Sequence, residues 1–162
     1  MKNKNRIGIM FVCHGNICRS PMAEFIFADM VKRHGIEDCF FISSSATSTE
    51  EIWNGVGNPV YPPAREELAK HGISCGNKHA VQLKKSDYDK YDMFIGMDEA
   101  NIRNMHKIFG GDADKKIHKL LDYTGSGRDV ADPWYSGRFD EAYNDIYRGC
   151  AALTDSIVQG LK

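Results

Sequence analysis

The sequence has no apolar run long enough to cross a membrane. Its longest such stretch covers residues 7–13, whereas a spanning helix needs about 20 residues. The basic residues before this stretch do not make a secretory signal peptide, because the stretch is short, continues into polar residues and lacks a small-residue cleavage site. There is also no internal repeat, low-complexity segment or linker. We therefore expect a cytoplasmic protein without membrane partners, folded as one domain over residues 1–162.

Charge of one sign is not in excess, and cysteine is scarce. The chain has 21 Lys and Arg against 22 Asp and Glu, for a net charge of −1, which argues against a nucleic-acid partner or a polyacidic disordered chain. An odd number of cysteines, five, argues against a disulfide framework. None has zinc-finger spacing, so we expect no structural metal. Three of the five are expected to pack in the core: Cys39, Cys75 and Cys150.

What the sequence does contain is an alternation of strand and helix patterns. Strands are predicted at 7–12, 39–42, 93–97 and, more weakly, 117–121, and helices at 20–34, 62–71, 98–108 and 139–158. Such alternation predicts an α/β fold with a mostly parallel sheet and helices on both faces. In these sheets ligands bind outside the carboxyl ends of the strands. Segments 45–61 and 122–138 lack a regular pattern, and long irregular loops are often functional.

The loop after the first strand has the composition of an anion-binding loop. It runs from Cys13 to Arg19 and leads into a helix that Ser20 and Pro21 are expected to start. Inward-pointing backbone N–H groups and the helix dipole would attract a tetrahedral anion. Gly15 and Asn16 tolerate the positive φ of a curled loop. Arg19 offers a planar, permanently charged fork to two phosphate oxygens.

Cys13 lies in the same electropositive loop, which favours the thiolate form of its side chain. A thiolate beside a bound phosphate is a nucleophile for phosphoryl transfer, and Ser20 is close enough in sequence to hydrogen-bond its sulfur. The alternative is structural. Cysteine is often a small buried hydrophobe, and Ser20-Pro21 can be a helix start and nothing more.

Residues 13–24, Cys-His-Gly-Asn-Ile-Cys-Arg-Ser-Pro-Met-Ala-Glu, closely resemble the signature of the low-molecular-weight protein tyrosine phosphatases, and the resemblance extends along the whole chain. It implies a three-layer α/β/α domain with a four-stranded parallel sheet. It also implies a phosphocysteine intermediate on Cys13, no metal or organic cofactor, and release of inorganic phosphate from a phosphotyrosine protein or a small aryl phosphate. We expect a monomer. The phosphate would be held by His14, Gly15, Asn16, Ile17, Cys18, Arg19 and Ser20.

A general acid is needed to protonate the departing aryloxide, and such a group contributes about 10²–10⁴-fold. The family carries an Asp-Pro followed by aromatic residues near its C-terminal end, and Asp132-Pro133 matches it. By this resemblance Asp132 is the acid in the first half-reaction and the base in the second. Asp129 is the other candidate. Without the resemblance, Asp-Pro is a turn signal in a solvated loop.

Aromatic residues are expected to wall the pocket. Trp134 and Tyr135 resemble the family's aromatic pair, and Trp53 resembles the aromatic residue on the opposite wall. Two such walls would hold a flat phenyl phosphate, although exposed aromatics also serve packing or partner contacts. The loop that contains Trp53, residues 44–61, is longer than usual for the family. Tyr61 precedes Pro62 where many members carry Asp, so substrate preference is expected to differ.

The resemblance also assigns supporting roles. Ser44 and His71 match positions that join Asn16 and Ser20 in a hydrogen-bond network behind the loop. His71 has a second explanation, because histidine is favoured by the dipole at a helix C-terminus. Cys18 matches a thiol that can form a protective disulfide with the nucleophile; alternatively it packs under the loop.

Three other functions share this kind of loop. Arsenate reductases of the same fold need two further cysteines on a mobile segment, and only Cys75 lies near that region. Protein arginine phosphatases carry Thr at the position of Ile17 and lack the bulky aromatic pair, so Ile17 with Trp134 and Tyr135 favours phosphotyrosine. A phosphopeptide-binding module without catalysis would need no general acid, and Asp132 argues against it.

Overall fold

A four-stranded parallel sheet forms the centre of the computed structural model, which describes residues 5–161. Its strands are β1 (Ile7–Cys13), β2 (Phe40–Ala46), β5 (Met93–Gly96) and β6 (Ile117–Lys119), in the order β2-β1-β5-β6. All three pairings are parallel. The α/β class and the four-stranded parallel sheet expected from the sequence are confirmed.

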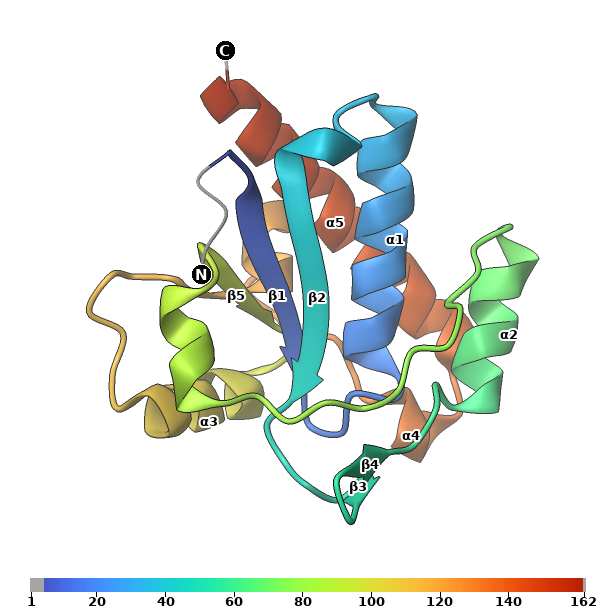
Figure 1. Cartoon of the computed structure of the whole chain (residues 1–162). Helices are drawn as coiled ribbons and strands as arrows, with labels where there is room; N and C mark the ends of the chain where they lie inside the picture. The colour runs from blue at the N-terminus through green and yellow to red at the C-terminus, as the bar shows by residue number, and fades with distance from the viewer. Residues whose placement is uncertain (1–4, 162) are drawn as a thin grey trace.

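Helices cover both faces of this sheet (Figure 1). They are α1 (Arg19–Arg33), α2 (Pro62–Lys70), α3 (Glu99–Phe109) and α5 (Phe139–Leu161). Successive residues of a strand point to opposite faces. Ile9 and Phe11 of β1 therefore join the core under α1, α2 and α5, while Met10 and Val12 join the core under α3. A strand buried on both faces explains why β1 is a continuous apolar run.

The two segments without a regular pattern contain short elements that the sequence analysis did not predict. Residues 45–61 begin with the end of β2 and then form a hairpin of β3 (Ile52–Trp53) and β4 (Val56–Gly57). Its turn residues, Asn54 and Gly55, both have positive φ, as a tight hairpin turn requires. Residues 122–138 contain the one-turn helix α4 (Pro133–Ser136). Short 3-10 helices occupy Glu37–Cys39, Lys85–Asp89 and Leu120–Thr124.

Most element boundaries differ from the expected ones by one to a few residues. Helix α1 begins at Arg19, with Cys18 as N-cap and no side-chain capping bond, because the Ser20 hydroxyl is engaged by Cys13 and Asn16 instead. Strand β2 begins one residue later than expected and continues to Ala46. Strand β6 ends at Lys119, where the chain turns into a 3-10 helix. Among residues 5–161, no helix combines the length and apolar character that a membrane span requires.

Candidate active site

The Cys13 thiol lies at the carboxyl end of β1, at the base of the loop that leads into α1. The residue is only 3% exposed. Its Sγ is 3.0 Å from Ser20 Oγ, and the backbone N–H groups of Asn16 and Ser20 donate to it at 3.3 and 3.4 Å. Donors aimed at sulfur stabilise negative charge on it. The geometry therefore suits a thiolate.

Asn16 fixes the shape of this loop from inside. It is fully buried and adopts φ 59°, the left-handed conformation that asparagine tolerates better than most residues. Its Nδ2 donates to Ser20 Oγ at 2.7 Å and to Ser44 Oγ at 3.0 Å, and its Oδ1 accepts from the Val81 N–H at 3.0 Å. The structure thus brings Asn16, Ser20 and Ser44 together, as the sequence analysis expected.

Two residues that the sequence analysis missed complete this network. Ser44 Oγ donates to Glu24 Oε1 at 2.5 Å, and Lys78 Nζ donates to the Ser44 carbonyl at 2.9 Å and lies 3.8 Å from the Glu24 carboxylate. Burial raises the pKa of Glu24, against the bond from Ser44 and the charge of Lys78. Burial likewise lowers the pKa of Lys78, against the attraction of Glu24 and Cys13.

His71 is not part of this network, so its expected place behind the loop is wrong. It lies at the C-terminal end of α2, where its Nε2 is 3.2 Å from Glu67 Oε2 and its ring stacks on Tyr143 at 3.7 Å between centroids. The alternative reading, a histidine at a helix C-terminus, describes its position. Lys78, from the irregular segment after α2, reaches Ser44 instead.

Arg19 is buried and held by two other parts of the chain. Its Nη1 donates to Asp98 Oδ2 at 2.7 Å and to the Val130 carbonyl at 2.9 Å. Burial lowers the pKa of the guanidinium, but the charges of Cys13, Asp98 and Asp132 outweigh that effect and hold its pKa above the usual value. Arg19 therefore presents a fixed positive charge beside the thiol.

Asp132 faces the same guanidinium from the other side. Its Oδ2 lies 3.7 Å from Arg19 Nη2, and its Oδ1 caps α4 by accepting from the Trp134 N–H at 3.0 Å. The side chain is 30% exposed, so it can exchange protons with solvent. Asp129, the other candidate acid, instead accepts from Lys119 at 3.1 Å and from the Glu99 N–H at 3.2 Å.

These groups surround a cavity of about 140 Å³. It is lined by Cys13, His14, Gly15, Asn16, Ile17, Cys18, Arg19, Glu50, Glu51, Asp132, Trp134 and Tyr135. Asp129 and Ser20 do not line it. The structure thus gathers the expected nucleophile, arginine and acid in one small cavity with the two expected C-terminal aromatics.

Trp53 does not line this cavity, which corrects its expected place as the opposite wall. It is 80% exposed on the hairpin, paired in register with Val56. From the same segment, Glu50 and Glu51 line the cavity instead. Glu50 Oε2 lies 2.9 Å from Nε2 of His14, which also lines the cavity.

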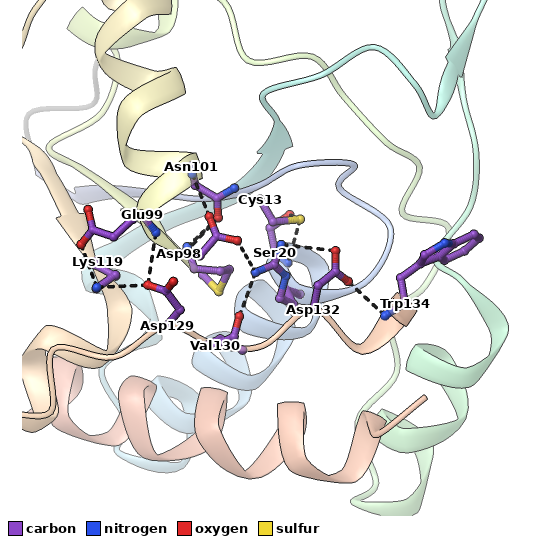
Figure 2. A network of polar contacts seen from close by, with 12 residues as sticks. Cys13, Ser20, Asp98, Glu99, Asn101, Lys119, Asp129, Val130, Asp132 and Trp134 are labelled. Atoms are coloured by element: carbon purple, nitrogen blue, oxygen red, sulfur yellow. Dashed lines mark hydrogen bonds and ion pairs between the residues drawn. The ribbon is translucent and has the colours of Figure 1, made fainter. Parts of the chain in front are cut away.

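A second polar network fixes the segment that carries Asp132 (Figure 2). The largely buried Lys119 donates from Nζ to Glu99 at 2.8 Å, to Asp129 at 3.1 Å and to the Gly127 carbonyl at 2.7 Å. Burial lowers the pKa of Lys119, but the bonds to Glu99 and Asp129 outweigh it and leave its pKa raised. The network ties the segment before Asp132 to α3 and β6.

Cys18 is buried under the loop, at 6% exposure. Burial raises the pKa of its thiol strongly, and the negative charges of Cys13 and Asp132 raise it further. Among the described residues no group of three or more His, Cys, Asp or Glu side chains is placed to hold a metal ion.

The fold and this site define an α/β protein with a cysteine-containing anion loop at the carboxyl end of its first strand. A family model described as low molecular weight phosphotyrosine protein phosphatase matches residues 8–162. The chain therefore belongs to the low molecular weight phosphotyrosine protein phosphatase family.

Individual relatives agree with this membership. The chain is 39% identical to the low molecular weight protein-tyrosine-phosphatase YfkJ of Bacillus subtilis, over 93% of this chain and 96% of that one. The YfkJ crystal structure matches with a TM-score of 0.90, covering 97% and 98% of the two chains. A Gallus gallus low molecular weight phosphotyrosine protein phosphatase is 36% identical over 91% and 93%. A mutant of the arginine phosphatase YwlE matches at 26% identity and a TM-score of 0.79, over 93% and 95%.

Proposed function

We propose that this protein hydrolyses phosphotyrosine and aryl phosphates through a phosphocysteine intermediate on Cys13. The observation that carries the proposal is the convergence of the Cys13 thiol, the Arg19 guanidinium and the Asp132 carboxylate on one cavity. Family membership supports it. We also propose that the protein works as a monomer in the cytoplasm, on phosphotyrosine proteins, and without a metal or organic cofactor.

The first half-reaction transfers the phosphoryl group to sulfur. The Cys13 thiolate attacks phosphorus, the bond between phosphorus and the aryl oxygen breaks, and Asp132 gives its proton to that oxygen. Arg19 and the backbone N–H groups of the loop hold the phosphate oxygens while their charge develops. Because Asp98 and the Val130 carbonyl fix Arg19 in advance, little reorganisation is needed.

The second half-reaction releases inorganic phosphate. Asp132, now a carboxylate, takes a proton from a water molecule that attacks the phosphocysteine, and the bond between phosphorus and sulfur breaks to regenerate the thiolate. The Ser20 hydroxyl, 3.0 Å from Sγ, stabilises the leaving sulfur. In this proposal Cys18 is the partner for reversible oxidation of Cys13.

The test is release of phosphate from phosphotyrosine, phosphoserine and phosphoarginine peptides, measured with chelator present. We expect turnover of phosphotyrosine alone, lost in Cys13→Ser and retained in the control Cys39→Ser, which changes a cysteine outside the cavity. Preference for phosphoarginine would keep the mechanism and overturn the substrate. Binding of phosphotyrosine peptide without release would indicate a binding module instead.

The role of Asp132 is tested separately, since this residue both faces the cavity and caps α4. Asp132→Asn keeps an oxygen that can accept from the Trp134 N–H but carries no proton to donate. We expect kcat/KM, which reports on the first half-reaction, to fall by about 10²–10⁴-fold for aryl phosphates with poor leaving groups, with a much smaller loss for good leaving groups. A uniform loss across leaving groups would show that Asp132 is not the acid.

A further inference from the structure

A second hollow adjoins the candidate active site and has no role in the proposed chemistry. It measures about 410 Å³, and Pro59, Val60, Tyr61 and Pro62 form much of its lining. It shares three lining residues with the catalytic cavity: Ile17, Glu51 and Trp134. We call it the Tyr61 groove. Because the two hollows share these three residues, a molecule bound in the cavity lies next to the groove.

The groove is built from side chains held in place. The Tyr61 ring packs against Trp134, with centroids 4.8 Å apart, and against Phe139 at 5.9 Å. The Tyr61 backbone N–H donates to the Ile17 carbonyl of the anion loop at 2.9 Å. Trp134 is 53% exposed and stands between the groove and the cavity. A rigid, apolar, partly exposed surface of this kind is typical of a binding site.

Charged groups of both signs line the groove, and they differ in position: Arg65 lines the groove but not the catalytic cavity and its Nη1 donates to the Gly76 carbonyl at 3.3 Å, whereas Glu51 also lines the catalytic cavity. Glu51 lies on the border between groove and cavity. Glu50 also lines the cavity, where its carboxylate lies 2.9 Å from His14 Nε2. At the border with the cavity, a carboxylate beside the phosphate would therefore meet the like charge of Glu51, whereas an apolar side chain would cover Tyr61 and Trp134 and remove them from water.

We propose that the Tyr61 groove binds an apolar side chain next to the phosphotyrosine of a protein substrate. The enzyme then prefers phosphotyrosine peptides with Leu or Phe within two residues of the phosphotyrosine over peptides with Asp or Glu there. Consecutive Cα atoms lie 3.8 Å apart, so such a neighbour reaches a hollow that shares a wall with the cavity. This inference rests on the proposed function and names the substrate class of the same site.

The first experiment compares kcat/KM of the unmodified protein for peptides that differ only in Leu or Asp beside the phosphotyrosine. We expect about tenfold or more in favour of Leu, the value of burying much of one aliphatic side chain. Equal values, or a preference for Asp, would overturn the proposal. A small aryl phosphate is assayed in parallel. If the proposed function is wrong, this compound is not hydrolysed either; if it is hydrolysed while the two peptides give equal values, only the groove proposal fails.

Variants then locate the preference. Tyr61 lies outside the catalytic cavity, so Tyr61→Ser is expected to erase the preference for Leu while kcat/KM for the aryl phosphate stays unchanged. Tyr61→Phe, which keeps the ring, should retain the preference, and so should Tyr147→Ser, which removes an exposed tyrosine of α5. A preference for Leu that survives in Tyr61→Ser would place its cause elsewhere and refute the groove.

A binding measurement covers the case in which Tyr61→Ser fails to fold. The chain has two tryptophans, so Trp53→Phe combined with Cys13→Ser leaves Trp134 as the sole indole reporter in a protein without turnover. We expect the Leu peptide to shift Trp134 emission further to the blue than either the Asp peptide or free phosphotyrosine. Equal shifts from all three would show that the groove stays empty.

Discussion

At the scale of single residues, the buried thiol of Cys18 is expected to react slowly with an oxidised Cys13. Burial raises the pKa of its thiol, yet attack on an oxidised Cys13 needs the thiolate. We therefore expect the protective disulfide between Cys13 and Cys18 to form slowly, and faster at higher pH. After hydrogen peroxide treatment, the fraction of activity recovered by added thiol should be larger at pH 8 than at pH 6.

Cys18→Ser is the matched variant for this experiment. Without a second thiol, oxidation of Cys13 continues to species that thiols do not reduce, so little activity should return at either pH. Recovery in Cys18→Ser equal to that of the unmodified protein would contradict a protective role for Cys18.

The buried carboxyl of Glu24 should make the free energy of unfolding depend on pH. Burial raises its pKa above the usual 4.5, so between pH 4.5 and its raised pKa the folded protein binds more protons than the unfolded chain. Its contribution to stability is therefore fully present at low pH and is lost as pH rises through the raised pKa. Glu24→Gln can keep the bond with Ser44 and has no such titration. The unfolding free energy of Glu24→Gln minus that of the unmodified protein should increase between pH 4.5 and pH 7.

Urea unfolding at several pH values measures this difference. Glu66→Gln, at an exposed position of α2, is the control. Its unfolding free energy minus that of the unmodified protein should not increase between pH 4.5 and pH 7. A constant difference for Glu24→Gln would mean that the carboxyl is not penalised by burial.

Single residues of the site could be predicted from the sequence where they lie close together along the chain. Cys13, Asn16 and Arg19 lie in one short run between a strand and a helix, so their proximity follows from the sequence. His71 and Lys78 are only seven positions apart, but the intervening chain has no regular structure. No periodicity indicates which of the two reaches Ser44, and the structure places Lys78 there.

At the scale of elements, the segment that carries Asp132 depends on Lys119 of β6. Lys119 holds Asp129, Glu99 and the Gly127 carbonyl, and so fixes the chain shortly before the acid. We expect Lys119→Met to misplace Asp132 and lower kcat/KM by about 10- to 10²-fold for poor leaving groups, since a misplacement near 1 Å can cost 10²-fold. The measurement is kcat/KM across aryl phosphates of graded leaving-group pKa.

A positioning role differs from a general loss of structure in one respect. In Lys119→Met the loss should be small for good leaving groups, which need little protonation, and Lys119→Arg should restore part of the rate. Lys107→Met, at an exposed position of α3, should behave like the unmodified protein. An equal loss for all leaving groups in Lys119→Met would refute the role in positioning the acid.

The regular elements were predictable because burial on both faces or along one stripe leaves a strong pattern. This holds for β1 and for the long amphipathic α5. The β3–β4 hairpin has two residues in each strand, too few to show a period of two. Its consequence for the site was missed for the same reason: the hairpin turns Trp53 outward and leaves Glu50 and Glu51 at the cavity.

At the scale of the whole molecule, the sheet order brings distant segments to one edge. β1 lies between β2 and β5, so the loop after β1 meets Ser44 near the end of β2 and Asp98 just after β5. Asp132 reaches the same edge from a segment tied to β6. Arg19 contacts Asp98, Val130 and Asp132, and an anion bound to it would join segments more than 100 positions apart.

Binding of phosphate should therefore stabilise the entire fold. At a concentration 100 times its dissociation constant, inorganic phosphate adds about 2.7 kcal/mol, which raises Tm by on the order of 5–10 °C for a chain of this size. Thermal unfolding measures the shift, with sodium chloride at matched ionic strength as the control. Arg19→Ala should lose most of the increase at the same phosphate concentration. An equal increase with chloride, or an undiminished one in Arg19→Ala, would show that the anion does not bind where Arg19 links these segments.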